Sequence, residues 1–396
     1  QLPRPGFVGS RSDISTKEFF FGFAHKVQRS QIGKGVWFMS LSDWMAEFPR
    51  KKLSDLQMPG SHDAGITKHY LDKTLFGTDS NSATQNLSFR DQLRAGTRFF
   101  DLRLESHNHK VVAQHTTAGQ GAYSSRGIDS ELAKIGRWCL RHPTEVVIIR
   151  ISHTSLGTDV HRIARKQAGE ALHRGQGNLC RKSLRRICRK GNLVLIFDEG
   201  KFGSVINQKK GIHSYSKYKK NPANDRGIST CGCYSGTNAL HKVVRNGLRG
   251  QYEHNSHVSK PGHLCQVYWQ KTYTNPFHGT GIEQGTHKKA RYSHGDGRVH
   301  GGTHAATDYM LRLMQGLSSA PRKNPRVRLP EDYVVQEKKS HKEGWRRKTV
   351  VDQEKVMYST EAFREFALPN IISYDFVNEE VNRKIIQLNR RGLQAT

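Results

Sequence analysis

Two short segments of this sequence carry polar side chains of the types that perform acid–base chemistry. The motif Met-Pro-Gly-Ser-His-Asp-Ala-Gly places His62 and Asp63 at what reads as the end of a strand. In the later run Phe-Phe-Asp-Leu-Arg-Leu, strand alternation puts Asp101 and Arg103 on one face and the apolar Phe100 and its alternate neighbours on the other. Charged groups inside an apolar run are costly to bury without a partner or a function. These residues are therefore candidates for a functional site.

A second histidine and a carboxylate near the C-terminal end extend this set. His115 ends the short apolar run Val-Val-Ala-Gln-His, and Asp375 follows the strand-like Asn-Ile-Ile-Ser-Tyr. Two histidines, an arginine and several carboxylates at strand ends make up an acid–base site for a phosphate ester. A lone histidine or aspartate is more often a satisfied core residue or a cap. It is the joint placement of these residues that favours a site.

Strand-like and helix-like segments alternate along the chain. Continuous apolar runs over 145–151 and 191–198 are typical of buried parallel strands. Apolar stripes or capping signals predict helices over 88–95, 129–140 and 379–391. The alternation indicates an α/β architecture.

The remaining segments have less regular patterns. Further strands are predicted over 53–58, 99–104, 111–115, 265–274 and 370–377, and a further helix over 305–317. Loops are expected over 66–87 and over the glycine- and serine-rich 119–126, and the basic region 201–264 shows no clear period.

The chain is strongly basic. Its 396 residues include 64 Lys and Arg against 34 Asp and Glu, which gives a formal net charge of +30. Such a charge attracts anionic polymers and anionic surfaces, so nucleic acid and acidic lipid are both candidate partners. The basic stretches carry no nucleic-acid-binding motif and no interleaved aromatic residues, so no specific nucleic acid is expected.

The compartment is predicted from weaker signals. No apolar run approaches the ~18 residues that a membrane span needs, and no apolar leader is present. The chain begins at Gln1 rather than Met, which favours a trimmed, secreted protein. The six cysteines are compatible with disulfides in such a protein, although the count alone gives no pairing. A structural zinc site at Cys231 and Cys233 is less favoured, because no second ligand pair has zinc-finger spacing.

The segment Trp44–Gly65, which ends in Leu-Ser-Asp-Leu-Gln-Met-Pro-Gly-Ser-His-Asp-Ala-Gly, resembles the opening of the phosphatidylinositol-specific phospholipase C catalytic domain of the X-domain type. The resemblance continues through Thr84-Gln, residues 90–103, Gln114-His-Thr, residues 145–152 and residues 370–378. It implies an irregular (β/α)8 TIM-type barrel with parallel strands and long basic loop insertions. Residues 1–44 would be an N-terminal extension packing on the barrel, and residues 45–396 the catalytic barrel.

The resemblance also implies a reaction. The phosphoryl group of phosphatidylinositol, or of a glycosylated relative, would pass to the inositol 2-hydroxyl, giving diacylglycerol and inositol 1,2-cyclic phosphate. By position, His62 would be the general base and His115 the acid that protonates the leaving glycerol oxygen. Asp375 would orient His62, and Asp63 would orient His115.

The phosphate-binding residue implied by the resemblance is Arg103, supported by Asp101. An arginine fork can meet two phosphate oxygens at once. The calcium-using branch of the family has a carboxylate at the position of Arg103, so this chain looks closer to the metal-independent bacterial branch. No metal or other cofactor is therefore expected, and a metal-dependent phosphodiesterase is disfavoured.

The headgroup specificity is less well defined than the catalytic residues. The bacterial branch has an arginine near the end of its fourth strand, where this chain has Asp198 followed by Glu199. Asp198, Lys271 and Tyr273 are the candidate substrate-binding residues. Another headgroup, or another phosphodiester, stays open as an alternative.

The expected partner is a phospholipid substrate at an anionic membrane surface, bound peripherally by a monomer. The basic stretch Arg162–Lys190 is a candidate contact face, and Leu75, Phe76 or the aromatic run Phe19–Phe23 could enter the lipid. A different class of function, a catalytically weak basic barrel that binds nucleic acid, is the alternative.

Overall fold

The computed structural model describes residues 40–117, 120–217, 224–232, 234, 262–269, 334–343, 346–355 and 369–390. The chain divides into two units, residues 1–38 and 39–396, and all described residues belong to the second. Several predictions therefore lie outside the described residues, namely the packing of most of segment 1–44, the helix over 305–317, and the placement of Cys233, Lys271 and Tyr273. No described helix is long and apolar enough to cross a membrane.

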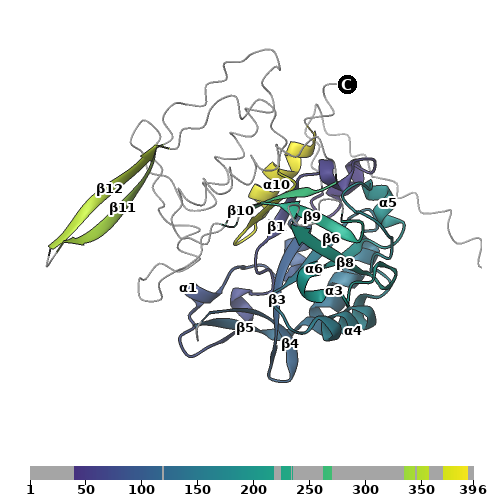
Figure 1. Cartoon of the computed structure of the whole chain (residues 1–396), viewed down its shortest axis with the longest axis horizontal. Helices are drawn as coiled ribbons and strands as arrows, with labels where there is room; N and C mark the ends of the chain where they lie inside the picture. The colour runs from purple at the N-terminus through teal and green to yellow at the C-terminus, as the bar shows by residue number, and fades with distance from the viewer. Residues whose placement is uncertain are drawn as a thin grey trace, which may run out of the picture. The chain divides into compact units, whose positions relative to one another are not determined.

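The predicted TIM-type barrel is confirmed. Within the described residues, eight parallel strands close on themselves, because the first also pairs with β3 through Gly60↔Phe99 and Ser61↔Phe100 (Figure 1). In order around the barrel the strands are β1 (Met58–Ser61), β13 (Ile371–Tyr374), β10 (Leu264–Trp269), β9 (Gly227–Cys231), β8 (Ile212–Lys217), β7 (Leu193–Asp198), β6 (Val147–Ser152) and β3 (Phe99–His107). We call the carboxyl ends of these strands the mouth and their amino ends the base.

An antiparallel extension continues the sheet beyond β3. It consists of β4 (Lys110–Thr117), β5 (Gln120–Gly127) and β2 (Leu71–Lys73). The predicted strand over 111–115 is confirmed, but the prediction of a loop over 119–126 was wrong. Pairing with β4 on one side and β2 on the other orders β5 despite its glycines and serines. The predicted loop over 66–87 likewise contains β2, a short helix α1 (Asp79–Ser82) and the 3-10 turn η3 (Lys68–Tyr70).

Helices connect the barrel strands. They are α2 (Phe89–Arg94), α3 (Ile128–Arg141), α4 (Gly157–Ala168), α5 (Leu184–Cys188), α6 (Glu199–Phe202) and α10 (Glu379–Gln387), with the 3-10 turns η1 (Trp44–Glu47), η4 (Gln208–Lys210) and η6 (Leu388–Arg390). The helix predicted over 88–95 begins as expected, since the Ser88 side chain accepts from the Asp91 backbone N–H. Gly96, with φ of 98°, ends it in the left-handed conformation that glycine tolerates best.

Two strand predictions differ from the structure. The strand expected over 53–58 starts only at Met58, because residues 53–55 form the 3-10 turn η2 (Leu53–Asp55). The region 201–264, in which no period was detected, contains β8 and β9. The hairpin of β11 (Val334–Glu343) and β12 (Arg346–Lys355) forms a separate antiparallel sheet.

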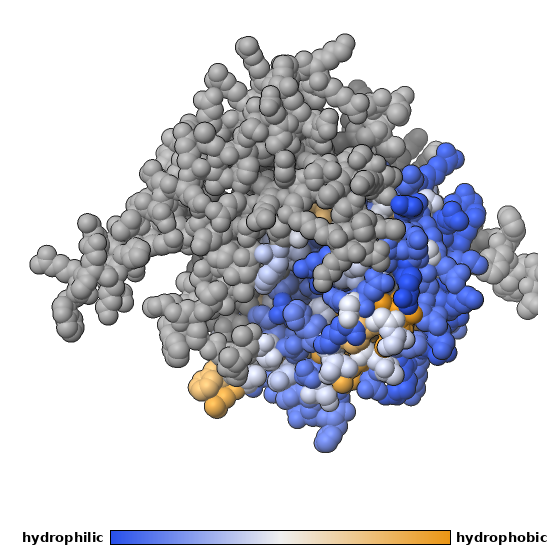
Figure 2. All heavy atoms as spheres, in the orientation of Figure 1, coloured by the Kyte–Doolittle hydropathy of each residue, from blue (hydrophilic) through white to orange (hydrophobic). Residues whose placement is uncertain are grey.

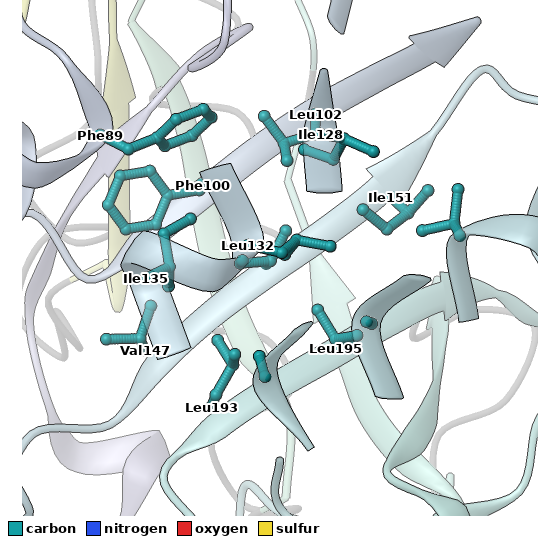
Figure 3. Close-up of a cluster of buried hydrophobic side chains, with 14 of the residues drawn as sticks. Phe89, Phe100, Leu102, Ile128, Leu132, Ile135, Val147, Ile151, Leu193 and Leu195 are labelled. Carbon is teal, nitrogen blue, oxygen red and sulfur yellow. The ribbon is translucent and has the colours of Figure 1, made fainter. Parts of the chain in front are cut away.

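Side-chain alternation along the barrel strands separates two apolar clusters. On β3, Phe100 and Leu102 face outward into a cluster with the helices, and Figure 3 shows them beside Phe89, Leu132 and Ile135. The second cluster fills the basal half of the barrel interior with Met58, Phe99, Ile148, Ile196 and Ile371. Each such buried side chain contributes about 1.5–3 kcal/mol of transfer free energy.

The inward-facing positions change character towards the mouth. On β3 they run from Phe99 to Asp101 and Arg103, and on β6 from Ile148 to Arg150. An apolar floor thus supports a polar layer, as a barrel that holds a site at the carboxyl ends of its strands requires.

The base is closed by two segments that bond to each other. The Leu53 backbone N–H donates to the Lys182 carbonyl over 3.0 Å, and the Leu184 N–H donates to the Lys51 carbonyl over 3.0 Å. Cys139, Cys180 and Cys188 are free thiols, so the expected disulfides do not involve these three cysteines.

Candidate active site

The structure brings the six residues predicted as catalytic together at the mouth. His62 and Asp63 follow β1, Asp375 follows the neighbouring β13, and the parallel pairing of these two strands sets their side chains together. His62 Nδ1 lies 2.8 Å from Asp375 Oδ1, and the two side chains are 6% and 2% exposed. With Nδ1–H donated to this carboxylate, Nε2 is left as the proton acceptor.

Asp63 lies at the centre of the remaining contacts. Its Oδ1 is 3.0 Å from Arg103 Nε, while its Oδ2 is 3.3 Å from His62 Nε2 and 3.8 Å from His115 Nε2. Neither carboxylate oxygen, nor Arg103 Nε, makes an aligned hydrogen bond to any described residue. Arg103 Nη2 in turn lies 3.4 Å from His62 Nε2.

His115 comes from the antiparallel extension rather than from a barrel strand. Its ring centroid lies 6.5 Å from that of His62, and the ring planes are inclined at 79°. Its Nδ1–H donates to the Ser82 carbonyl of α1 over 3.1 Å, which directs Nε2 towards Asp63. The extension therefore supplies the second histidine of the site.

Asp101 acts on Arg103 through its charge: burial opposes the charging of Arg103, but Asp63 and Asp101 both raise its pKa. Asp101 Oδ1 accepts from Ser152 Oγ over 3.2 Å, and its Oδ2 lies 3.7 Å from Arg150 Nη1. Strand register explains this, because Asp101 stands directly opposite Arg150 on β6. Among the described residues, the carboxylate in ion-pair contact with Arg103 is Asp63.

Two buried side chains brace the backbone around the histidine. The Thr84 hydroxyl donates to the Asp63 carbonyl over 2.8 Å. Gln85 Nε2 donates to the His62 carbonyl over 2.9 Å, and Gln85 Oε1 accepts from the Val377 N–H over 3.0 Å. Asp63 has φ of 39°, a conformation that non-glycine residues hold only when their surroundings enforce it. The hydrogen bonds from Thr84 and Gln85 hold the backbone in this conformation.

The electrostatics of the two histidines differ. Burial opposes the charging of His62, but the carboxylates of Asp63 and Asp375 outweigh it and raise its pKa. For His115, burial dominates and lowers the pKa, although Asp63 acts in the opposite direction. Burial also opposes the ionisation of Asp63, yet His62 and Arg103 outweigh it and lower its pKa. Asp63 is therefore a buried carboxylate that stays charged.

A cavity of about 210 Å³ opens beside these groups and reveals residues that the sequence did not single out. Arg150 Nη1 donates to the Tyr268 hydroxyl over 3.0 Å, and its guanidinium lies 4.3 Å from the centroid of the Tyr215 ring. His153 and Lys217 also line the cavity. Arg150 could have been identified from the sequence, because it is a positively charged residue inside the continuous apolar run 145–151.

The predicted substrate-binding residue Asp198 has another role in the structure. Its Oδ1 accepts from the Gly200 backbone N–H over 2.9 Å, so it caps α6. It does not belong to the described lining of the cavity. The strand turns directly into a helix at this position, and that turn takes up the carboxylate.

Three side chains here offer metal ligands. Ligand atoms of His62, Asp63 and Asp101 lie within 4.8 Å of one another. The guanidinium of Arg103, 3.0 Å from Asp63, already supplies a positive charge to this cluster and would repel a second cation. The absence of a metal requirement stays a prediction.

Known proteins resemble this chain in part of its sequence and in its fold. No protein-family model matches the chain. It is 30% identical over 148 residues to human PI-PLC X domain-containing protein 2, which corresponds to 30% of this chain and 46% of that protein. It is 29% identical over 147 residues to PI-PLC X domain-containing protein 3 of Danio rerio, or 32% of this chain and 44% of that protein. The matches thus span less than half of the length of these relatives.

Solved structures share the fold. A pentafluoro-Phe-containing phosphatidylinositol-specific phospholipase C from Staphylococcus aureus superimposes with a TM-score of 0.52 at 12% identity, covering 88% of this chain and 97% of that one. A second structure of the S. aureus enzyme gives the same TM-score, identity and coverage. At this identity the likeness concerns the barrel alone. In part of its sequence the chain is similar to PI-PLC X domain-containing proteins, and its barrel has the fold of bacterial phosphatidylinositol-specific phospholipases C.

Proposed function

We propose that this protein is a phospholipase C-type phosphodiesterase that cleaves phosphatidylinositol, or a glycosylated relative, by intramolecular phosphoryl transfer. The observation that carries the proposal is the pair of histidines on either side of one buried carboxylate, with an arginine beside them. Arg103 and Asp63 are held 3.0 Å apart without an aligned hydrogen bond, so the guanidinium keeps donors for a phosphate.

The reaction would use each group once. His62 Nε2 takes the proton of the inositol 2-hydroxyl while that oxygen attacks phosphorus, and Asp375 accepts from Nδ1–H and stabilises the imidazolium. Arg103 neutralises charge on the phosphoryl oxygens. The bond from phosphorus to the glycerol oxygen breaks, and His115 gives its proton to that oxygen. Diacylglycerol and inositol 1,2-cyclic phosphate result.

The pKa directions support these roles. The carboxylates around His62 raise its pKa and make it a stronger base, while burial lowers the pKa of His115 and makes it a stronger acid. These shifts favour each proton transfer once His62 is neutral and His115 is protonated, the two states that the mechanism requires.

The headgroup would lie in the cavity against Arg150, Tyr215 and Tyr268. The guanidinium is fixed between a ring face and a phenol hydroxyl, so it offers oriented donors to sugar hydroxyls. Asp198 is not included in this subsite, because its carboxylate caps a helix.

The membrane would be met at the mouth. Leu75 and Phe76, 89% and 64% exposed, stand on the loop between β2 and α1, and α1 contacts His115 through Ser82. Figure 2 shows hydrophobic spheres protruding where Figure 1 places the loop beside α1. Adjacent exposed apolar side chains next to a lipid-cleaving site suit insertion into a membrane surface. Secretion and a monomeric state stay predictions.

The test is product analysis of mixed phospholipid vesicles treated with the protein in chelator. We expect inositol 1,2-cyclic phosphate by phosphorus NMR, and none from a His115→Ala and His62→Ala double variant. Inactivity on every lipid would contradict the proposed function. Activity that appears only when calcium is restored would contradict the metal-independent mechanism while leaving the substrate in place.

A further inference from the structure

The base of the barrel carries a concentrated positive charge far from the candidate active site. Residues 49–56 and 181–190, which we call the basal surface, contain nine Lys and Arg and a single acid, Asp55. The backbone bonds between the two segments make them one surface. Among the described residues, neither Arg185 nor Arg189 has an ion-pair partner, and both are exposed.

The stretch Arg162–Lys190, which is expected to be a membrane-contact face, lies partly at this end of the barrel, and its contact with a membrane stays a prediction. The segment bonds to the first residues of barrel strands: the His173 N–H donates to the Leu193 carbonyl, and the Leu179 N–H to the Gly227 carbonyl, each over 2.8 Å. These are amino ends, whereas His62 and Asp375 follow carboxyl ends. A membrane bound at the mouth therefore leaves the basal surface facing away.

A mainly apolar pocket of about 390 Å³ opens at the edge of the basal surface and is lined partly by its residues. Its walls come from η1, the turn before β6 and α5, through Met45, Pro49, Pro143 and Leu184 among others. Arg185 and Arg189 also line it, and their spacing of four residues places both guanidinium groups on one side. Leu140, 49% exposed, precedes the lining residue Pro143 by three residues in the sequence.

This combination selects one kind of partner. Nucleic acid is bound through phosphates and through stacking on aromatic rings. The large apolar side chains exposed among the described residues are Leu75, Phe76, Leu140 and Tyr234, and of these only Leu140 is basal. Trp44 and Phe48 of the base are buried. The base therefore offers a pocket for an aliphatic or ring side chain, bordered by two arginines, and no stacking platform.

We propose that the basal surface docks an acidic segment of a partner protein, which places one apolar side chain in the pocket and carboxylates on Arg185 and Arg189. Arginine is the residue best suited to hold carboxylates bidentately. An apolar anchor in a pocket with a charged rim is the usual arrangement of the residues that dominate an interface. The proposal does not depend on the lipid substrate, because the basal surface and the mouth share no residue.

The test measures binding of two fluorescein-labelled peptides to the full-length protein by anisotropy, in about 0.15 M salt. Both peptides carry four glutamates, which flank a central leucine in one and a serine in the other. We expect the leucine peptide to bind at least tenfold more tightly. Arg185→Ser with Arg189→Ser should weaken it at least tenfold, and the charge-matched control Arg165→Ser with Lys166→Ser on α4 less than twofold.

A second variant addresses the pocket without removing charge. Ala46 is exposed and lines the pocket, so Ala46→Trp should fill it and abolish the preference for leucine over serine. If this variant is unfolded by circular dichroism, Thr144→Trp on the same lining replaces it. Cleavage of a monomeric substrate should be unchanged in each variant.

Three results would overturn the proposal. Equal affinity for the two peptides, or equal losses in the basal and α4 variants, would reduce the surface to diffuse charge. The third result is that a single-stranded 12-mer oligonucleotide binds more tightly than the leucine peptide and loses this binding in Arg185→Ser with Arg189→Ser. That result would assign the surface to nucleic acid.

Discussion

Two buried pairs of an arginine and a carboxylate, one at each end of the barrel, invite comparison. At the base, Arg98 and Glu145 are both fully buried, and Arg98 Nη2 lies 2.7 Å from Glu145 Oε2. The guanidinium also donates to the carbonyls of Leu93, Thr97, Leu41 and Ser42. At the mouth, Arg103 Nε lies 3.0 Å from Asp63 Oδ1, but neither Arg103 Nε nor the Asp63 carboxylate makes an aligned hydrogen bond within the described part of the chain.

This difference in hydrogen bonding indicates that Arg98 and Glu145 form a structural ion pair, whereas Arg103 and Asp63 form a pair that can bind a ligand. The basal pair has its donors and acceptors satisfied, so it ties η1, α2 and β6 together and has nothing left for a ligand. The pair at the mouth keeps unsatisfied capacity beside a cavity, which suits a site that binds a charged substrate. Substitutions at the two ends should therefore affect different properties.

The largest expected effect is on activity. Arg103→Ala should reduce kcat/KM on phosphatidylinositol by on the order of 10³, because it removes the charge that would neutralise the phosphoryl oxygens. The midpoint of thermal unfolding should change less than in the basal variant below, since Arg103 is partly exposed and His62 still faces Asp63. Arg103→Lys is the control, and it should recover only part of the loss because an ammonium lacks the fork. Near-native turnover in Arg103→Ala would remove the arginine from the mechanism.

The basal pair should show the reverse. Glu145→Gln removes one charge and leaves the Arg98 guanidinium buried and uncompensated, so the free energy of unfolding should fall by about 3–5 kcal/mol. Urea denaturation measures the change, with Glu47→Gln at an exposed ion pair as the matched control at under ~1 kcal/mol. Activity per folded molecule should be retained. A loss of turnover without a loss of stability would contradict the assignment of this pair to structure.

The two histidines should be separable by the leaving group. His62→Ala and His115→Ala should each lower the rate on phosphatidylinositol by about 10² or more. A substrate with a nitrophenol leaving group needs no proton from the enzyme, so it should restore most of the rate to His115→Ala and little to His62→Ala. Equal recovery in both variants would show that the acid and base roles are not divided as proposed.

The sequence predicted those parts of the fold in which local pattern and environment agree. Alternation in β3 identified Asp101 and Arg103 on one face because that strand is buried on both faces, apolar on one and polar on the other. β8 and β9 escaped detection because much of their buried surface is polar. Ser214 Oγ and Ser216 Oγ both hydrogen-bond to Asn224, over 2.8 and 2.9 Å, a network that no hydrophobic period reveals.

Within the site, residue types were easier to predict than partners. His62 and Asp375 are 313 residues apart, and no local pattern could pair them, so that expectation came from the family resemblance. Arg103 was paired with Asp101, two positions away on the same strand. Asp101 does raise the pKa of Arg103, but the carboxylate in close contact is Asp63, which follows the neighbouring β1. Strand register, which the sequence does not state, decides which carboxylate the guanidinium contacts.

The smallest expected effect concerns pH and again distinguishes base from mouth. Burial lowers the pKa of His213, near the amino end of β8, to about 3, although its contact with the His173 carbonyl acts in the opposite direction. The folded protein keeps this ring neutral while the unfolded chain protonates it below pH ~6.5, so stability is lost as pH falls from about 6.5 towards 3. The effect of His62 on stability has the opposite sign, because its pKa is raised in the folded protein. Its contribution to the free energy of unfolding is present below pH ~6.5 and is lost as the pH rises.

The two contributions can be distinguished by comparing unfolding free energies at pH 7 and pH 5. His213 alone should account for about 2 kcal/mol of the decrease over this interval, from the proton bound only by the unfolded chain. His213→Gln can still donate to the His173 carbonyl but cannot titrate, so its decrease should be smaller than that of the native protein by this amount. His62→Gln should make the decrease larger, because a group that stabilises the fold in acid has been removed. If His213→Gln loses as much stability on acidification as the native protein, the acid sensitivity lies elsewhere, and the base and the mouth do not differ in this property.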